Sequence, residues 1–163
     1  MIRVLTDTLS DLPQEIVDSY AITQVPLYIH FGQEAFRDRV DLSGDEFYKR
    51  LASFPGLPTT SSPSVGDFQQ AYTNLQADDP KTTILSIHIA STLSGTISSA
   101  RQAADMLPGA NIHIFDTLSG SLAEGLMVLE AARMASENAT LDAILNRLTG
   151  MREGMQLLLT PST

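Results

Sequence analysis

Short apolar runs alternate along this chain with segments whose apolar residues recur every three to four positions. The short runs predict β-strands, which we expect at residues 2–5, 25–31, 82–89, 111–115 and 155–160. The helical spacing predicts helices over 14–20, from 43 to about 54, from 64 to about 75, from 96 to about 107, over 117–136, and after 140. Strands that alternate with helices predict an α/β layered fold with a mostly parallel sheet flanked by helices.

Polar residues mark where several of these helices begin. Ser43 stands three residues before Glu46, which is the spacing of a capping box, and Ser64 with Asp67 resembles another helix start. Thr140 is expected to cap the helix that follows it. The long helix at 117–136 is marked by leucines that repeat every three to four residues: Leu118, Leu122, Leu126 and Leu129.

Hydroxyl-bearing residues gather in two loops of the predicted fold. Residues 90–96 read Ala-Ser-Thr-Leu-Ser-Gly-Thr and come directly before a helix, and the loop at 54–63 ends in Thr-Thr-Ser-Ser-Pro. Ligands of open α/β sheets bind beyond the carboxyl ends of the strands, a rule that gathers Asp7, residues 90–96 and Asp116 at one edge. Hydroxyls and free amides at a helix N-terminus suit an anion, so a carboxylate or phosphate could be held there without Lys or Arg.

The same residues also have structural interpretations. Ser64 fits the role of a helix N-cap, and Ser91 or Ser94 fits a cap of the helix that follows. Asp7 and Asp116 stand at strand ends, where carboxylates often brace turns through bonds to the backbone. The three histidines, which lack a second ligand at metal-binding spacing, are expected to be structural or surface groups: His30, His88 and His113.

Composition and charge narrow the possible functions. The 163 residues suit one hydrophobic core, and a net charge of −9 disfavours nucleic acids and anionic membranes as partners. The chain has no cysteine, which excludes disulfides and thiolate metal sites and fits a cytoplasmic location. The N-terminus does not resemble a signal peptide, and no apolar run is long enough to span a bilayer, so we expect no stable membrane insertion.

Catalytic motifs are weak in this sequence. Leu9 follows Thr6-Asp7-Thr8 where a phosphoaspartate phosphatase would carry a second aspartate, and no nucleophile elbow, Walker loop or dinucleotide fingerprint is present. We therefore expect a binding domain with no catalytic residue, no metal and no cofactor. Two alternatives remain open: a metal-dependent phosphate-ester hydrolase or phosphotransferase that uses Asp7 or Asp116, and a protein-interaction fragment without a ligand.

An ordered set of short motifs resembles the DegV family along essentially the whole chain. The motifs are Thr6-Asp7-Thr8 with Asp11-Leu12-Pro13, Val25-Pro26-Leu27, Phe36-Arg37-Asp38, Phe47-Tyr48, Thr60-Ser61-Ser62-Pro63-Ser64, Leu93-Ser94-Gly95-Thr96 followed by Ser99-Ala100, and Asp116-Thr117. Each motif alone is weak, whereas their order and spacing together are specific. One departure is Ala90-Ser91, where the family usually has two serines.

The resemblance implies a non-catalytic protein that binds a long-chain fatty acid and presents it to a separate fatty-acid kinase. The carboxylate contacts would fall on Thr60, Ser61 and Ser91, with Ser94 and Thr96 shaping the loop. The full set of ligand-binding residues implied is Thr60, Ser61, Ser62, Ser91, Thr92, Ser94, Gly95 and Thr96. Family members are longer, so residues 1–163 are expected to form a DegV-like N-terminal domain that stops before a second domain.

Overall fold

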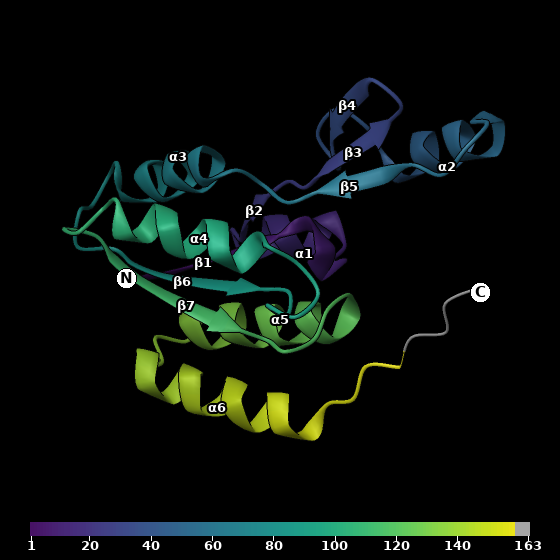
Figure 1. Cartoon of the computed structure of the whole chain (residues 1–163). Helices are drawn as coiled ribbons and strands as arrows, with labels where there is room; N and C mark the ends of the chain where they lie inside the picture. The colour runs from purple at the N-terminus through teal and green to yellow at the C-terminus, as the bar shows by residue number, and fades with distance from the viewer. Residues whose placement is uncertain (159–163) are drawn as a thin grey trace.

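The computed structural model describes residues 1–158, and its elements follow the predicted α/β alternation (Figure 1). The strands are β1 (Ile2–Asp7), β2 (Thr23–Val25), β3 (Tyr28–Phe31), β4 (Glu34–Arg37), β5 (Thr59–Ser61), β6 (Thr83–His88) and β7 (Asn111–Asp116). The helices are the short 3-10 helix η1 (Thr8–Ser10) and the α-helices α1 (Gln14–Ser19), α2 (Gly44–Ser53), α3 (Val65–Gln76), α4 (Thr96–Asp105), α5 (Leu122–Ser136) and α6 (Leu141–Gly154).

A parallel sheet of four strands, in the order β2-β1-β6-β7, forms the centre of the main body. Side chains alternate across each strand, so Val4 of β1 faces α5 and α6 while the next residue, Leu5, faces α3 and α4. α3 and α4 cover one face of the sheet, and α5 and α6 cover the other (Figure 1). This three-layer arrangement confirms the predicted fold class.

A second, antiparallel sheet in the order β4-β3-β5 projects from the body together with α2, and we call this unit the arm (Figure 1). The prediction of one strand over 25–31 was wrong, because Pro26 has no backbone N–H to continue a ladder and the chain changes sheets there. The prediction that 54–63 is entirely loop was also wrong, since β5 lies within it. Ile29 and Phe31 pack against α2 through Phe47 and Phe54, which gives the arm a small core of its own.

The predicted helix starts are confirmed at three places. Ser43 and Ser64 both form complete capping boxes, and the Thr140 side chain accepts a hydrogen bond from the backbone of Ala143. The helix predicted at 117–136 begins only at Leu122, because Leu118 and Ser121 adopt left-handed backbone conformations.

Three of the four leucines that marked α5 lie outside its buried face, and only Leu129 packs against the core. Leu118, Leu122 and Leu126 are more than half exposed, whereas the helix turns smaller residues toward the sheet: Gly125, Val128, Ala131 and Ala132. Of the strand predicted at 155–160, residues 155–158 have no regular secondary structure, and the remaining two lie outside the described residues.

A close approach of α5 to η1 explains why Gly125 lies inside a helix. A Cβ atom at Gly125 would fall far inside van der Waals contact of the Ser10 carbonyl oxygen. Backbone atoms cannot move aside as a flexible side chain can, so this contact sets the spacing between the helix and the carboxyl end of β1.

We expect Gly125→Ala to lower the free energy of unfolding by about 1–3 kcal/mol, as overpacked core substitutions do. Gly150→Ala is the matched control, because Gly150 lies inside α6, is exposed, and leaves open space around an added methyl group. There the better helix propensity of alanine should raise stability by up to about 1 kcal/mol. Urea unfolding of both variants measures the difference, and equal effects would contradict the close approach.

Candidate functional site

Asp7 ends β1 at the edge of the sheet where the two predicted loops also lie, and its side chain is completely buried. Its Oδ2 atom lies 2.9 Å from His88 Nδ1 and accepts a hydrogen bond from the Ile89 amide at 3.4 Å. Its Oδ1 atom accepts a hydrogen bond from the Leu9 amide at 3.1 Å. Asp7 is therefore the turn brace that the structural interpretation predicted, and its bonds fix the start of the loop after β6.

The buried bonds continue from His88 into the body. His88 Nε2 lies 2.6 Å from Ser86 Oγ, which in turn lies 2.9 Å from the Tyr72 hydroxyl. Burial raises the pKa of Tyr72 to about 12. The order Asp–His–Ser matches a catalytic triad, but these side chains are completely buried, so a substrate has no access to them. Ser86 and His88 stand two residues apart on β6 and so share one of its faces, but Asp7 is 81 positions from His88 in the sequence, so the network was not predicted.

Hydroxyl groups join the two predicted binding loops. Ser62 Oγ lies 3.1 Å from Ser94 Oγ, and Ser94 Oγ lies 2.8 Å from Thr96 Oγ1. Ser94 also accepts a hydrogen bond from the Thr96 amide in the first turn of α4. Asp116 braces the same loop, since its Oδ1 atom accepts hydrogen bonds from the amides of Ser91 and Leu118. The structure thus brings these hydroxyl residues to one edge of the sheet, as the sequence predicted.

Strand alternation separates Thr60 from Ser61. Thr60 pairs with Ile29 and lines a pocket beneath the arm, whereas Ser61 faces the other side of the arm sheet. There Ser61 Oγ lies 2.9 Å from His30 Nε2. Ser62 follows the end of β5 and contacts Ser94. Of the remaining predicted residues, Ser91, Thr92 and Gly95 are exposed on the loop between β6 and α4, whereas Thr96 is buried.

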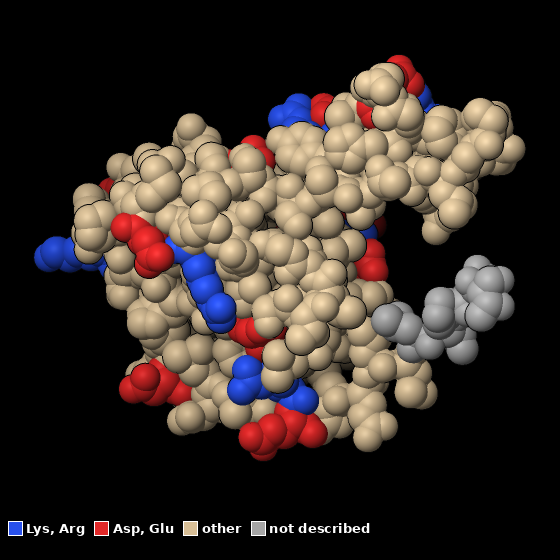
Figure 2. Space-filling model, in the orientation of Figure 1, with Lys and Arg blue, Asp and Glu red and all other residues tan. Residues whose placement is uncertain are grey.

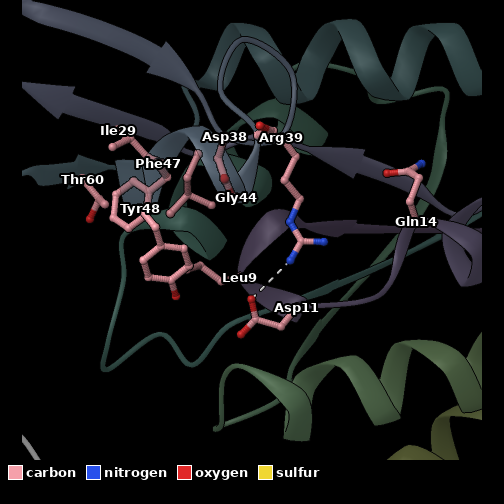
Figure 3. A pocket seen from close by; sticks show the side chains of 12 residues that line it. Leu9, Asp11, Gln14, Ile29, Asp38, Arg39, Gly44, Phe47, Tyr48 and Thr60 are labelled. Atoms are coloured by element: carbon pink, nitrogen blue, oxygen red, sulfur yellow. Dashed lines mark hydrogen bonds and ion pairs between the residues drawn. The ribbon is translucent and has the colours of Figure 1, made fainter. Parts of the chain in front are cut away.

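The pocket beneath the arm has a volume of about 510 Å³. Figure 2 shows the molecule hollowed where the arm overhangs the body, and Figure 3 shows the side chains that line this space. The larger share of its exposed wall is apolar and comes from Leu9, Leu27, Ile29, Phe47 and Tyr48. Polar side chains complete the lining: Asp11, Gln14, Asp38, Arg39, Ser43 and Thr60, of which Thr60 belongs to the predicted site. The sequence did not reveal this pocket, because its walls come from segments far apart in the chain.

An ion pair lies at the edge of this pocket and was also missed from the sequence. Arg39 Nη2 lies 3.3 Å from Asp11 Oδ1, as the dashed line in Figure 3 marks, and Arg39 Nη1 donates to the Leu12 carbonyl. The other Asp11 oxygen accepts a hydrogen bond of 2.7 Å from Ser121. The backbone is left-handed at all three residues of this group: Asp11, Arg39 and Ser121. Ordinary turn residues share that conformation, so only the side-chain contacts set these three apart.

Glu124 is the second acid buried near the edge of the sheet. Its Oε1 atom accepts a hydrogen bond of 3.1 Å from Thr6, and its side chain is fully enclosed between α5 and β1. Burial raises the pKa of this carboxyl to about 10, and the charge of Asp7 adds to the rise. Glu124 is therefore protonated at neutral pH.

Metal sites and membrane-spanning helices are both absent from residues 1–158. No group of three or more His, Asp or Glu side chains there could hold a metal ion. No helix in that range is both long enough and apolar enough to cross a bilayer.

Comparisons of this chain with known proteins identify one family. The model of a family described as "Uncharacterised protein, DegV family" matches residues 1–163. A DegV domain-containing protein of Staphylococcus aureus is 37% identical over 153 residues, which are 93% of this chain and 53% of that protein. The chain therefore spans about half the length of the curated relatives it matches.

Solved structures of the same family are similar in fold. A fatty-acid-binding DegV family protein from Thermus thermophilus is 35% identical with a TM-score of 0.84, over 93% of this chain and 53% of that one. DegV from Bacillus subtilis, described as a fatty acid binding protein, is 31% identical with a TM-score of 0.86, over 93% of this chain and 54% of its own.

The protonated state of Glu124 predicts how stability depends on pH. The unfolded chain releases this proton above pH 4.5, whereas the folded protein keeps it to about pH 10, so the stability that Glu124 contributes falls as the pH rises between these values. Glu124→Gln removes the titration and should become increasingly stable relative to the unchanged protein from pH 5 to pH 9, by roughly 1 kcal/mol per pH unit.

Glu130→Gln is the control for this measurement. Arg133 and Arg147 lower the pKa of Glu130 to about 2, so its contribution is complete above pH 4.5 and is lost only as the pH falls toward 2. Its effect on stability should therefore be constant between pH 5 and pH 9. Urea unfolding across this range measures both variants, and a constant effect for Glu124→Gln would show that Glu124 is ionised in the folded protein.

Proposed function

The chain belongs to the DegV family, and from this premise we propose that it binds a long-chain fatty acid through the carboxylate. The observation that carries the proposal is a pair of hydroxyls in contact directly after β5, the strand whose Thr60 lines a largely apolar pocket. Ser94 and Ser62 are in contact, and Thr60, two residues before Ser62, lines the pocket. A polar anchor next to an apolar pocket fits an amphipathic anion. The relatives described as fatty-acid-binding proteins support the same ligand class.

The carboxylate would be held by neutral donors at the start of α4. Within residues 1–158, the amides of Thr92, Gly95 and Ile97 have no hydrogen-bond partner, so they can donate to a ligand. The hydroxyls of Ser91 and Ser94 lie on the same loop. Hydrogen bonds to a charged group contribute about 1.5–3 kcal/mol each, and the helix N-terminus adds a favourable partial charge.

The acyl chain would lie in the pocket beneath the arm. Each methylene that leaves water contributes about 0.8 kcal/mol, so an apolar wall of this kind supplies most of the affinity for a long chain. Leu27, Ile29 and Phe47 present such a wall beside Thr60. A small anion such as inorganic phosphate would leave that wall unused.

The wider role of the protein is part of the same proposal. Residues 1–163 would form the N-terminal domain of a carrier, and the half of the relatives that this chain does not match would help to enclose the acyl chain. The carrier would act in the cytoplasm, would present its fatty acid to a separate fatty-acid kinase, and would catalyse no reaction itself. The hydrolase alternative has less support, because Asp7 is fully buried and both of its oxygens already accept hydrogen bonds.

Mass spectrometry of a solvent extract from the purified protein tests the proposal directly. We expect fatty acid in stoichiometric amount, because a bound long chain leaves an apolar pocket slowly. Delipidated protein should then take up added palmitate or oleate in a binding titration. Failure both to carry and to take up fatty acid would contradict the proposal for this chain.

Ser91→Ala should weaken fatty-acid binding by roughly tenfold, because one hydrogen bond to a carboxylate is lost. Ser64→Ala is the matched control, since Ser64 caps α3 and donates to Asp67 rather than to a ligand. It should leave the affinity unchanged but lower the free energy of unfolding by about 1 kcal/mol. Titration and urea unfolding of both variants separate the two effects, and equal losses of affinity would exclude Ser91 from the site.

A further inference from the structure

Two consecutive amides of the hydroxyl loop, residues 90–96 between β6 and α4, are tied to the end of β7. The Ala90 amide donates to the Ser119 carbonyl at 2.7 Å, and the Ser91 amide donates to Asp116 Oδ1 at 3.3 Å. These bonds fix the backbone of Ser91 beside the carboxyl end of β7. The Asp116 carboxylate therefore contacts the residue whose hydroxyl is a proposed ligand contact.

We propose that Asp116 makes the anchor selective for the single charge of a carboxylate over the double charge of a phosphate. This inference rests on the proposed function. Neutral hydroxyls and amides at a helix N-terminus suit either anion, so these donors alone do not separate the two. A fixed negative charge beside them repels a dianion about twice as strongly as a monoanion.

The charge of Asp116 is not cancelled by a direct contact. Its Oδ1 atom accepts hydrogen bonds from the amides of Ser91 and Leu118, whereas its Oδ2 atom accepts none from residues 1–158. Within that range, none of the ion pairs involves Asp116. Arg152 does contact this residue, but it donates to the backbone carbonyl at 2.9 Å rather than to the carboxylate.

The same charge would lie close to a bound anion. A ligand that accepts a hydrogen bond from the Ser91 hydroxyl would lie within about 8 Å of Asp116, which is about one Debye length at physiological ionic strength. Repulsion over this distance is only partly screened by salt. At low ionic strength it should lower the affinity by roughly threefold to tenfold for each unit of ligand charge.

Asp116→Asn separates the charge from the hydrogen bonds. Asparagine keeps a carbonyl oxygen that can accept from the same two amides, and its amide nitrogen would take the place of the unbonded Oδ2 atom. Asp116→Ala removes both the charge and the bonds. Asp105→Asn is the matched control, because it makes the same change of charge at the exposed far end of α4, about 14 Å along the helix from Thr96.

The experiment titrates delipidated protein with myristate and with tetradecyl phosphate, two ligands of equal chain length, at pH 8 and low ionic strength. The phosphate monoester is a dianion at this pH. We expect the unchanged chain to bind myristate more tightly. In Asp116→Asn both affinities should rise, and their ratio should shift toward the phosphate by roughly threefold to tenfold. The shift should shrink at about 1 M salt, where the Debye length is about 3 Å.

The other two variants complete the test. Asp105→Asn should leave the ratio unchanged, and Asp116→Ala should bind both ligands more weakly than Asp116→Asn, because Ser91 is no longer held. An unchanged ratio in Asp116→Asn, with folding confirmed by urea unfolding, would overturn the inference while leaving fatty-acid binding intact. An equal shift in Asp105→Asn, or tighter binding of the phosphate by the unchanged chain, would overturn it as well. No binding of myristate or a longer fatty acid by the unchanged chain would instead contradict the proposed function, and this inference with it.

Discussion

The buried contact between Asp7 and His88 is the constraint on which the rest of the site depends. Taking a carboxylate and an imidazole out of water is costly unless each polar atom gains a partner. Here both oxygens of Asp7 and both nitrogens of His88 have one, and the bonds extend through Ser86. The pair joins the carboxyl ends of β1 and β6. One oxygen of Asp7 also fixes Leu9 in the pocket wall, and the other fixes Ile89 directly before the hydroxyl loop.

The position of the arm depends on contacts at that edge of the parallel sheet. The arm strands β4, β3 and β5 form a separate sheet and do not pair with the strands of the body. Pro26 lets the chain leave the parallel sheet, and β5 brings it back beside the loop after β6. The contact between Ser62 and Ser94 joins the two units at the point where a ligand's polar end would lie. The arm therefore does two things at once: its underside forms an apolar wall, and its return strand completes the polar anchor.

Local signals allowed much of this structure to be predicted from the sequence. Capping residues such as Ser43 and Ser64 act within one helical turn, and the rule for sheet edges located the loops of the site. The errors arose where distant contacts decide the outcome. The apolar run that contains Pro26 continues across a change of sheet, so its pattern hides the break. Leucine spacing revealed α5 but not its buried face, which Gly125 and the alanines form because the helix approaches η1 closely. The contact of Arg39 with Asp11 spans 28 positions in the sequence and leaves no periodic signal.

The chemistry of the anchor determines how a protein of this kind could choose its ligand. An acidic chain with a net charge of −9 offers no long-range attraction to a carboxylate, and the hydroxyl loop supplies short-range donors without a fixed positive charge. Any carboxylate satisfies such donors equally well, so the anchor cannot distinguish one fatty acid from another. Discrimination must then come from the acyl chain, where each methylene contributes a similar increment until the wall ends. Under the proposed function, the extent of apolar wall that the acyl chain can cover would therefore carry the specificity.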